Sequence, residues 1–237
     1  MTADGWTSAV RHQLGLGRLL PLGGPRDGAW ITEAAAGAVL RRAVGHMEGV
    51  RLGALRLAAA DPAAAEEPVV PPPPGALPPG PVRVAADVAV YASEPLPATA
   101  SRLRAALAAA ATERLGLVVS EVDLRVTDLL DEEREPEAVR PGPEPPPVVA
   151  AQHGDEARAS DAALSVPGVT RLTDVVGRAV RLEEREHAAA LPHRHARVEI
   201  AVSAQHRALD VARQVRAAVS EALRDHPTVT VLVTAVE

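Results

Sequence analysis

The stretch Val82–Val90 reads VRVAADVAV, and its alternation decides how the first half of the chain folds. Every second residue in it is small and apolar: Val84, Ala86, Val88 and Val90. This period of two predicts a half-buried β-strand. A second run, ARVEIAV at Ala196–Val202, has the same Arg-Val pair at its second and third positions and alternates in the same way. The two runs raise the question of whether one folding unit is written twice.

The flanks of the first run predict the rest of a small unit. Ile31–Met47 reads as a helix with Thr32 as its N-cap, and a strand ending at Leu57 follows. After the alternating run, a longer helix is expected to end at Gly116, followed by a last strand. The apolar stripe of that helix consists of Leu96, Leu103, Leu107 and Leu115. The inward face of the last strand consists of Val122, Leu124 and Val126.

The second half of the chain repeats this order with changed spacing only in loops. Compositional bias could produce one such match, but five in sequence favour a tandem duplication. We therefore expect an α+β fold of two tandem α-β-β-α-β units, each with a small three-stranded sheet and helices on one face. The matched pairs are Gly49-Val50 with Gly168-Val169, Ala54–Leu57 with Ala179–Leu182, Arg83-Val84 with Arg197-Val198, Leu103–Leu107 with Val215–Val219, and Asp123–Leu129 with Thr230–Val236.

Two proline-rich stretches, 58–81 and 131–147, predict semi-rigid spacers, because proline fixes φ and cannot donate a ladder hydrogen bond. The glycine-rich stretch Gly15–Gly28 predicts a flexible arm. The expected organisation has four parts: an N-terminal arm with a short amphipathic helix (1–28), a first unit with a proline-rich insertion (29–130), an acidic proline-rich linker (131–149), and a second, degenerate unit (150–237).

The first unit resembles the alkaline shock protein family, the envelope stress response proteins of Gram-positive bacteria. The resemblance covers about 31–130, and the second copy lacks the tyrosine and the Gly-Leu turn. The chain also resembles GC-rich bacterial proteins that carry a nucleopolyhedrovirus fibrillar-protein family name, although no residue here indicates a viral function. The residues that carry the first resemblance are Gly49-Val50, Val84–Tyr91, Leu96-Pro97, Leu115–Leu117, Val119, Val122, Leu124, Val126 and Asp128.

The alkaline shock resemblance implies a non-enzymatic, cytoplasmic scaffold or adaptor with no cofactor. It also implies protein–protein contacts at the cytoplasmic side of the envelope, with a membrane-anchor protein as one partner and a homo-oligomer as another possibility. The proline insertion, the tandem layout and the N-terminal extension depart from the family pattern.

The composition excludes several classes of function. The chain has 237 residues, a net charge of −6, no Cys and only 1% aromatic residues. A duplex reader needs a basic face and a single-strand binder needs stacking aromatics, so we expect no nucleic acid as partner. Without Cys there is no thiolate nucleophile or Cys-based zinc site. No apolar run is long enough to span a bilayer directly.

Few residues suggest chemistry, and each has a plainer interpretation. His193 and His195 lie two apart on one strand face and could form half of a metal or ligand site, which is the alternative to the adaptor hypothesis. No third ligand follows at a known spacing, so a solvated strand start is favoured. Catalytic residues are not expected, because no nucleophile elbow or comparable motif occurs.

Two sets of residues are candidates for binding a partner. Trp6, Val10 and Leu14 recur at helical spacing and could dock on a partner or on a membrane surface, or fold back on their own domain. Glu199 and Ser203 replace Ala85 and Ala89 of the first copy, and they are expected on the strand face that points away from the core.

Overall fold

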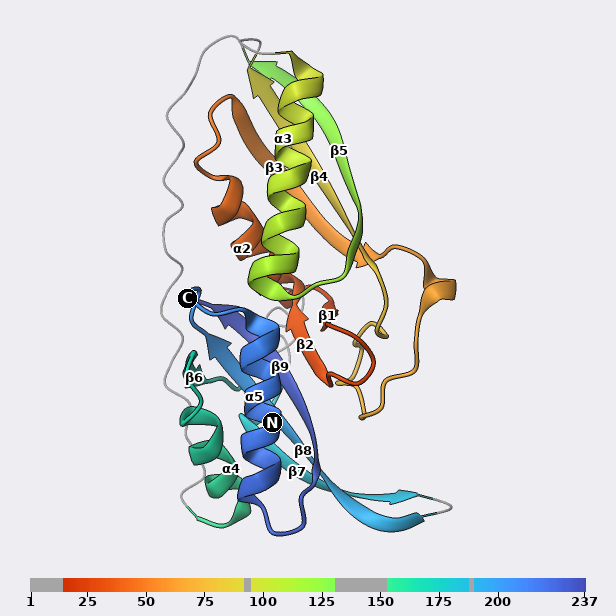
Figure 1. Ribbon diagram of the computed structural model, residues 1–237, viewed down its shortest axis with the longest axis vertical. Coiled ribbons are helices and arrows are strands. Elements are labelled where there is room, and N and C mark those ends of the chain that lie inside the picture. Colours follow the sequence, from red (N-terminus) through yellow and green to blue (C-terminus); the bar gives the residue numbers. More distant parts are fainter. Residues whose placement is uncertain (1–14, 92–94, 131–152, 188–189) are drawn as a thin grey trace, which may run out of the picture.

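The computed structural model describes residues 15–91, 95–130, 153–187 and 190–237. These residues form four α-helices and nine strands in two sheets. Figure 1 shows the three-stranded sheet in the upper half and the six-stranded sheet in the lower half. Helices α3 (Leu96–Ala109) and α5 (Ala208–Ala222) lie in front of them. The mixed α and β content agrees with the α+β class expected from the sequence.

The three-stranded sheet has the order β3-β4-β5 with β4 in the centre, antiparallel to β3 and parallel to β5. The alternation that predicted β4 is confirmed, because Val84, Ala86, Val88 and Val90 are all buried. The helix that follows β4 is also confirmed and ends at Gly116, but its first residue, Leu96, is 40% exposed. The elements of this half are α2 (Glu33–Val44), β3 (Val50–Ala59), the 3-10 helix η1 (Pro62–Ala64), β4 (Val82–Tyr91), α3 (Leu96–Ala109), the π-helix η2 (Ala110–Leu115) and β5 (Val119–Leu130).

The six-stranded sheet has the order β1-β2-β9-β8-β6, and β7 also pairs with β8. Strands β6 and β7 lie along the same strand, β8, both antiparallel to it, and β9 is parallel to it. A three-stranded sheet was expected here, so the prediction of sheet size is wrong for this half. The elements are β1 (Leu19–Leu22), β2 (Ala29–Thr32), α4 (Asp155–Leu164), β6 (Val169–Leu172), β7 (Val180–His187), β8 (Ala190–Val202), α5 (Ala208–Ala222) and β9 (Thr228–Val236).

The extra strands come from the N-terminal stretch that was expected to be a flexible arm. Strands β1 and β2 form an antiparallel hairpin, and β2 pairs in parallel with β9, so that Ile31 lies opposite Val233. The expected boundaries at 28 and 29 are therefore wrong, because 19–32 belong to the sheet of the C-terminal half. For the same reason α2 begins at Glu33 rather than Ile31, although Thr32 is its N-cap as predicted and accepts a hydrogen bond from Ala35 N.

The proline-rich insertion is not a free spacer in the structure. It runs from the three-stranded sheet down beside β1 and β2, as Figure 1 shows in orange. Val70 is 3% exposed and packs with Trp30 and Leu232 in a second, smaller core on the outer face of the six-stranded sheet. The Nε1 of Trp30 donates to the carbonyl oxygen of Leu77 at 3.0 Å. The insertion therefore buries apolar surface that the sheet would otherwise expose to water.

The two halves share one continuous hydrophobic core. Helix α2 packs against both β3 and β9, and η2 contacts α2 and α5. Leu40 of α2, Leu107 of α3 and Val215 of α5 are all fully buried members of the same cluster. The N–H of Gly23 donates to the carbonyl oxygen of Gly116 at 3.0 Å, which links the two halves through the backbone. We therefore expect them to unfold together.

Gly49 and Gly168 occupy matched positions and offer a controlled test of packing. Both have a positive φ, 78° and 94°, which costs an L residue about 1–2 kcal/mol. A Cβ on Gly49 would meet nothing within 4 Å, whereas one on Gly168 would lie 2.8 Å from a methyl carbon of Val211 and 2.9 Å from His206 Cγ. We expect Gly168→Ala to lower the free energy of unfolding by about 1–3 kcal/mol more than Gly49→Ala in urea titrations. Equal losses would contradict this packing.

Candidate functional site

The edges of the two sheets differ in how far they are covered. At the β1 edge, Leu77 N donates to the carbonyl oxygen of Leu19 at 2.9 Å, so the insertion caps that edge. At the β3 edge, Leu57 N donates to a carboxylate oxygen of Glu33 at 2.9 Å, and Arg18 donates to the carbonyl oxygen of Leu57 at 3.4 Å. Such side-chain and loop caps are a usual means of preventing edge-to-edge pairing.

Strand β5 is a 12-residue edge that pairs, among the described strands, with β4 alone. Arg104 Nε donates to the carbonyl oxygen of Val122 at 3.2 Å and covers one point of this edge. This bond shows that the backbone groups of Val122 point away from β4. Because the direction alternates along a strand, Leu124 and Val126 present their N–H and C=O groups to the same open side.

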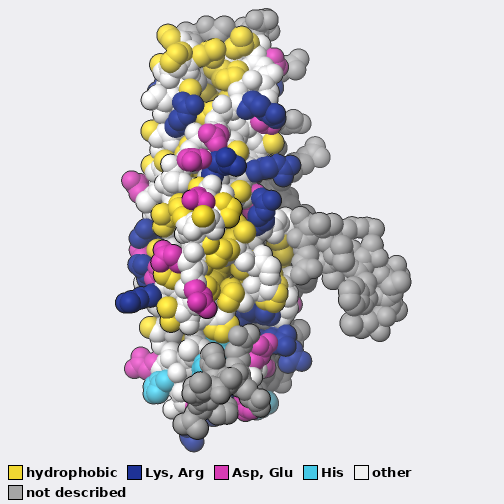
Figure 2. Space-filling model, turned by 90° about the vertical axis from the view of Figure 1, so that its right-hand side faces the viewer, with side chains coloured by type: hydrophobic (Ala, Val, Ile, Leu, Met, Phe, Trp, Pro, Cys, Tyr) yellow, Lys and Arg dark blue, Asp and Glu magenta, His cyan; other side chains and the backbone are white. Residues whose placement is uncertain are grey.

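The outer face of the three-stranded sheet carries charges in alternating order. Arg125 of β5 makes two bonds of 2.8 Å to the carboxylate of Asp87 on β4. Those hydrogen bonds are the main reason why the pKa of Asp87 lies below its ordinary value. Asp123 lies 3.8 Å from Arg83 of β4. Figure 2, which views the right-hand side of Figure 1, shows basic and acidic side chains interspersed over the upper half of this face.

The inner side chains of β5 are only partly covered. Val122 and Leu124 are half-buried under α3, whereas Val126 is 44% exposed and Leu129 is 55% exposed. Strand β5 therefore combines a row of open backbone groups with apolar side chains in reach of solvent. An edge of this kind is a template for pairing with another strand.

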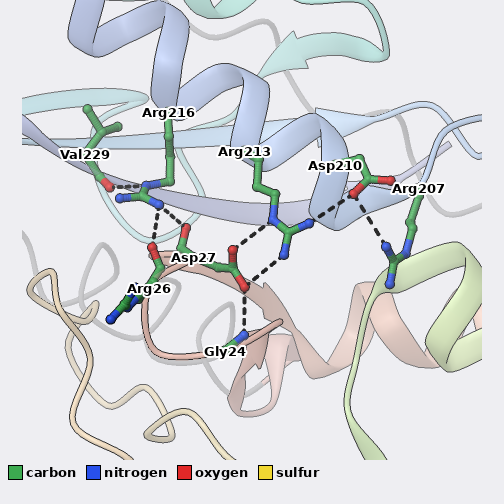
Figure 3. Close-up of polar contacts among 8 residues, drawn as sticks. All are labelled: Gly24, Arg26, Asp27, Arg207, Asp210, Arg213, Arg216 and Val229. Atoms are coloured by element: carbon green, nitrogen blue, oxygen red, sulfur yellow. Dashed lines mark hydrogen bonds and ion pairs between the residues drawn. The ribbon is translucent and has the colours of Figure 1, made fainter.

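A second polar cluster joins the hairpin loop between β1 and β2 to helix α5 (Figure 3). Asp27 accepts two hydrogen bonds from Arg213, at 2.8 and 3.2 Å, and a third from Gly24 N at 2.8 Å. Burial acts to raise the pKa of Asp27, but these hydrogen bonds outweigh it and hold the pKa below its ordinary value. Arg216 donates to the carbonyl oxygens of Arg26, Asp27 and Val229. The polar groups of this cluster are hydrogen-bonded to one another, so the cluster attaches the β1–β2 hairpin to α5.

Glu199 is not exposed, which corrects the expectation that it offers a binding surface. It lies on the sheet face away from the helices, as expected, but 173–179 fold over that face between β6 and β7 and leave it 0% exposed. Val176 N donates to Glu199 Oε2 at 2.9 Å, whereas Oε1 has no hydrogen-bond partner among the described residues and lies 4.0 Å from Arg197 Nε. Burial raises the pKa of Glu199 to about 7. Ala85, its counterpart in β4, is exposed.

The other predicted residues do not converge on one site. Ser203 follows β8, is half-buried, and its hydroxyl accepts a hydrogen bond from Gln205 N. His195 is 5% exposed with Nδ1 2.8 Å from the Thr228 hydroxyl, and His193 is half-buried. Within the described parts of the chain, no three His, Asp or Glu side chains are placed to hold a metal ion. The candidates Trp6, Val10 and Leu14 and the acidic linker lie outside the described residues.

The sequence analysis did not predict the edge of β5 as a binding site. The order of elements could have indicated it, because the last strand of an α-β-β-α-β unit lies at the edge of its sheet. The opposed charges at Asp123 and Arg125 could not be recognised as significant without the register of β5 against β4.

No family model, curated protein or solved structure matches the chain. Among the described residues, no helix is both long enough and apolar enough to cross a membrane.

Proposed function

We propose that this protein is a non-catalytic adaptor built from two copies of one α-β-β-α-β unit. The topology supports the repeat: α2-β3-β4-α3-β5 and α4-β6/β7-β8-α5-β9 each have an antiparallel pair followed by a parallel one. Strand β3 has a register shift between Leu52 and Leu55. At the corresponding position of the second copy, the longer loop 173–179 separates β6 from β7. The cytoplasmic face of the envelope is the location that the alkaline shock resemblance suggests.

The observation that carries the proposal is the edge of β5, which the described residues cover only where Arg104 binds it. An adaptor acts by holding other chains, and an uncovered strand edge supplies hydrogen bonds to an incoming strand. The partner that fits this edge best is β5 of a second copy of the chain. A membrane-anchor protein would then bind elsewhere on the dimer.

The sequence of β5 is self-complementary in one antiparallel register. With Leu124 of one copy opposite Leu124 of the other, Val122 faces Val126 on each side. These are the residues whose backbone groups point to the open edge, so they form the hydrogen-bonded pairs of the new ladder. The bond from Arg104 to the Val122 carbonyl oxygen is exchanged for a ladder bond.

The same register also matches the charges. Asp123 of each copy faces Arg125 of the other, and opposite charges directly across a ladder stabilise the pairing. Arg125 would then lie between Asp87 of its own sheet and Asp123 of the second copy. The result is a continuous six-stranded sheet with two-fold symmetry, the commonest symmetry of soluble oligomers.

Sedimentation equilibrium tests the proposal. The wild-type protein is expected to have twice the chain mass of 24.6 kDa, and the Asp123→Arg variant, which places two Arg pairs across the ladder, is expected to have the chain mass. Asp161→Arg is the matched control, because Asp161 is an exposed acid on α4, in the other half of the chain, and this variant should remain a dimer. A wild-type protein of single-chain mass at all concentrations would contradict the proposal.

A further inference from the structure

A cavity of about 280 Å³ lies where the two halves of the chain meet. Its walls come from α2 and the turn after it, from η2, from the loop between β8 and α5, and from the end of β9. This position is outside the carboxyl ends of the parallel strands β8 and β9, where ligands bind in many α/β sheets. The adaptor proposal makes no use of this cavity.

The titratable side chains that line the cavity are all basic in type. Arg42 and His46 come from α2 and the turn after it, Arg114 comes from η2, and His206 comes from the loop before α5. No acidic side chain of the described residues lines it. Three segments that are far apart in the sequence therefore place two guanidinium groups and two imidazoles around one cavity. A convergence of several hydrogen-bond donors on a concave surface is typical of a site for an anion.

The guanidinium groups of Arg42 and Arg114 have no binding partner among the described residues. Neither Arg42 nor Arg114 forms an ion pair or a side-chain hydrogen bond with any described residue. The side chain of Glu237, the acid next in sequence to the lining residue Val236, is bound to Arg171 at 2.7 and 3.0 Å and to Thr170. Within the part of the chain that the structure describes, the two arginines are thus available to a ligand.

The floor of the cavity is apolar. Val39 is 4% exposed and Val236 is 8% exposed, and the remaining walls come from Ala43 and Ala204. A bare inorganic ion would leave these surfaces in contact with water. An anion with a short hydrocarbon body would cover them and keep its charged end at the basic rim.

We propose that this cavity binds the oxyanion of a small organic molecule, a phosphate monoester or a carboxylate, between Arg42 and Arg114. The guanidinium groups form charge-assisted bonds to the oxyanion, and the imidazoles of His46 and His206 donate further hydrogen bonds. Because the ligand bridges α2, η2 and the β8–α5 loop, it ties the two halves of the chain together at their junction.

Isothermal titration calorimetry of the full chain tests the site with n-butyl phosphate, n-butyrate and inorganic phosphate in buffers of equal ionic strength. Saturable binding of n-butyl phosphate or n-butyrate is expected, with a higher affinity than for inorganic phosphate because of the apolar floor. Comparison of the first two distinguishes a phosphate ester from a carboxylate. Arg42→Gln and Arg114→Gln should each lower the affinity roughly 10-fold or more, the usual effect of losing a charge-assisted bond.

Arg41→Gln is the matched control, because Arg41 precedes Arg42 on α2, is also exposed and does not line the cavity. This variant should bind within about twofold of the wild type, since exposed charges at a distance are screened by salt. Absence of saturable heat with all three probes would overturn the proposal. An equal loss of affinity in Arg41→Gln and Arg42→Gln would overturn it as well, because binding would then follow net charge alone.

Discussion

Replacing Trp30 with alanine is expected to lower the free energy of unfolding by about 3–5 kcal/mol, the usual range for a fully buried tryptophan. Trp30 is 1% exposed and packs with Leu19, Val70 and Leu232 between the six-stranded sheet and the proline-rich insertion. The substitution leaves a cavity there and removes the bond to the carbonyl oxygen of Leu77. Urea titration of the wild type and the variant measures the loss.

Trp30→Ala should also detach the proline-rich insertion from the six-stranded sheet. Cleavage by a glutamate-specific protease after Glu66, which lies in the insertion, is expected to become faster. Trp30→Phe is the control, because it keeps an aromatic ring in the core and loses the hydrogen bond and only part of the buried volume, so a smaller loss of about 1–3 kcal/mol is expected. Loss of less than about 1 kcal/mol in the alanine variant, with unchanged cleavage, would show that the insertion is not anchored at Trp30.

Replacing Glu199 with glutamine is expected to make the protein more stable at high pH. The pKa of Glu199 is raised from 4.5 to about 7 in the folded protein, chiefly by burial, so the folded state holds the proton more tightly than the unfolded chain. The contribution of Glu199 to the free energy of unfolding therefore becomes steadily less favourable as the pH rises from about 4.5 to about 7. Above pH 7 this contribution is constant. This rise in the pKa of Glu199 corresponds to a loss of about 3 kcal/mol in the free energy of unfolding once the side chain is ionised.

Unfolding free energies measured at several pH values test this prediction. The Glu199→Gln variant should match the wild type near pH 4 and exceed it by up to about 3 kcal/mol at pH 8, because glutamine keeps an acceptor for the Val176 N–H without the charge. Glu48→Gln is the control, since Glu48 is exposed, and it should preserve the wild-type profile. A constant difference between Glu199→Gln and the wild type at all pH values would contradict a raised pKa.

Local patterns predicted the elements whose partners lie close in the sequence. The alternation of Val84 to Val90 predicted β4 because apolar residues facing a helix layer repeat every second position. Thr32 was predicted as an N-cap because its hydroxyl can accept a bond from a backbone N–H three residues on. Each of these depends on groups a few residues apart, which a sequence displays directly.

Non-local contacts account for the parts that the sequence did not predict. Strand β2 is short, and its partner β9 follows about 200 residues later, so Ile31 gave no local sign of lying opposite Val233. Glu199 has an alternating position that suggests an outer face, but the burial of that face depends on 173–179 folding over it. Tertiary context overrides local pattern in both cases.

The sequence could predict that β5 lies at a sheet edge. It could not predict which backbone groups of β5 point outward or which charged side chains pair across the sheet. The order of elements places β5 at a sheet edge. The direction of its free backbone groups follows only from the bond between Arg104 and the Val122 carbonyl oxygen. The ion pair of Arg125 with Asp87 likewise requires the register between two strands.

The most direct test of the central claim, that two copies pair through β5, is to mix two charge variants. Asp123→Arg and Arg125→Asp should each have the mass of a single chain, because each places like charges across the ladder. Their equimolar mixture should have the mass of a dimer, since both cross-ladder pairs then join an arginine of the first variant to an aspartate of the second. Sedimentation equilibrium measures all three masses, and far-ultraviolet circular dichroism checks that each variant is folded. Two folded variants that remain single chains when mixed, or that are dimers when alone, would contradict pairing through β5.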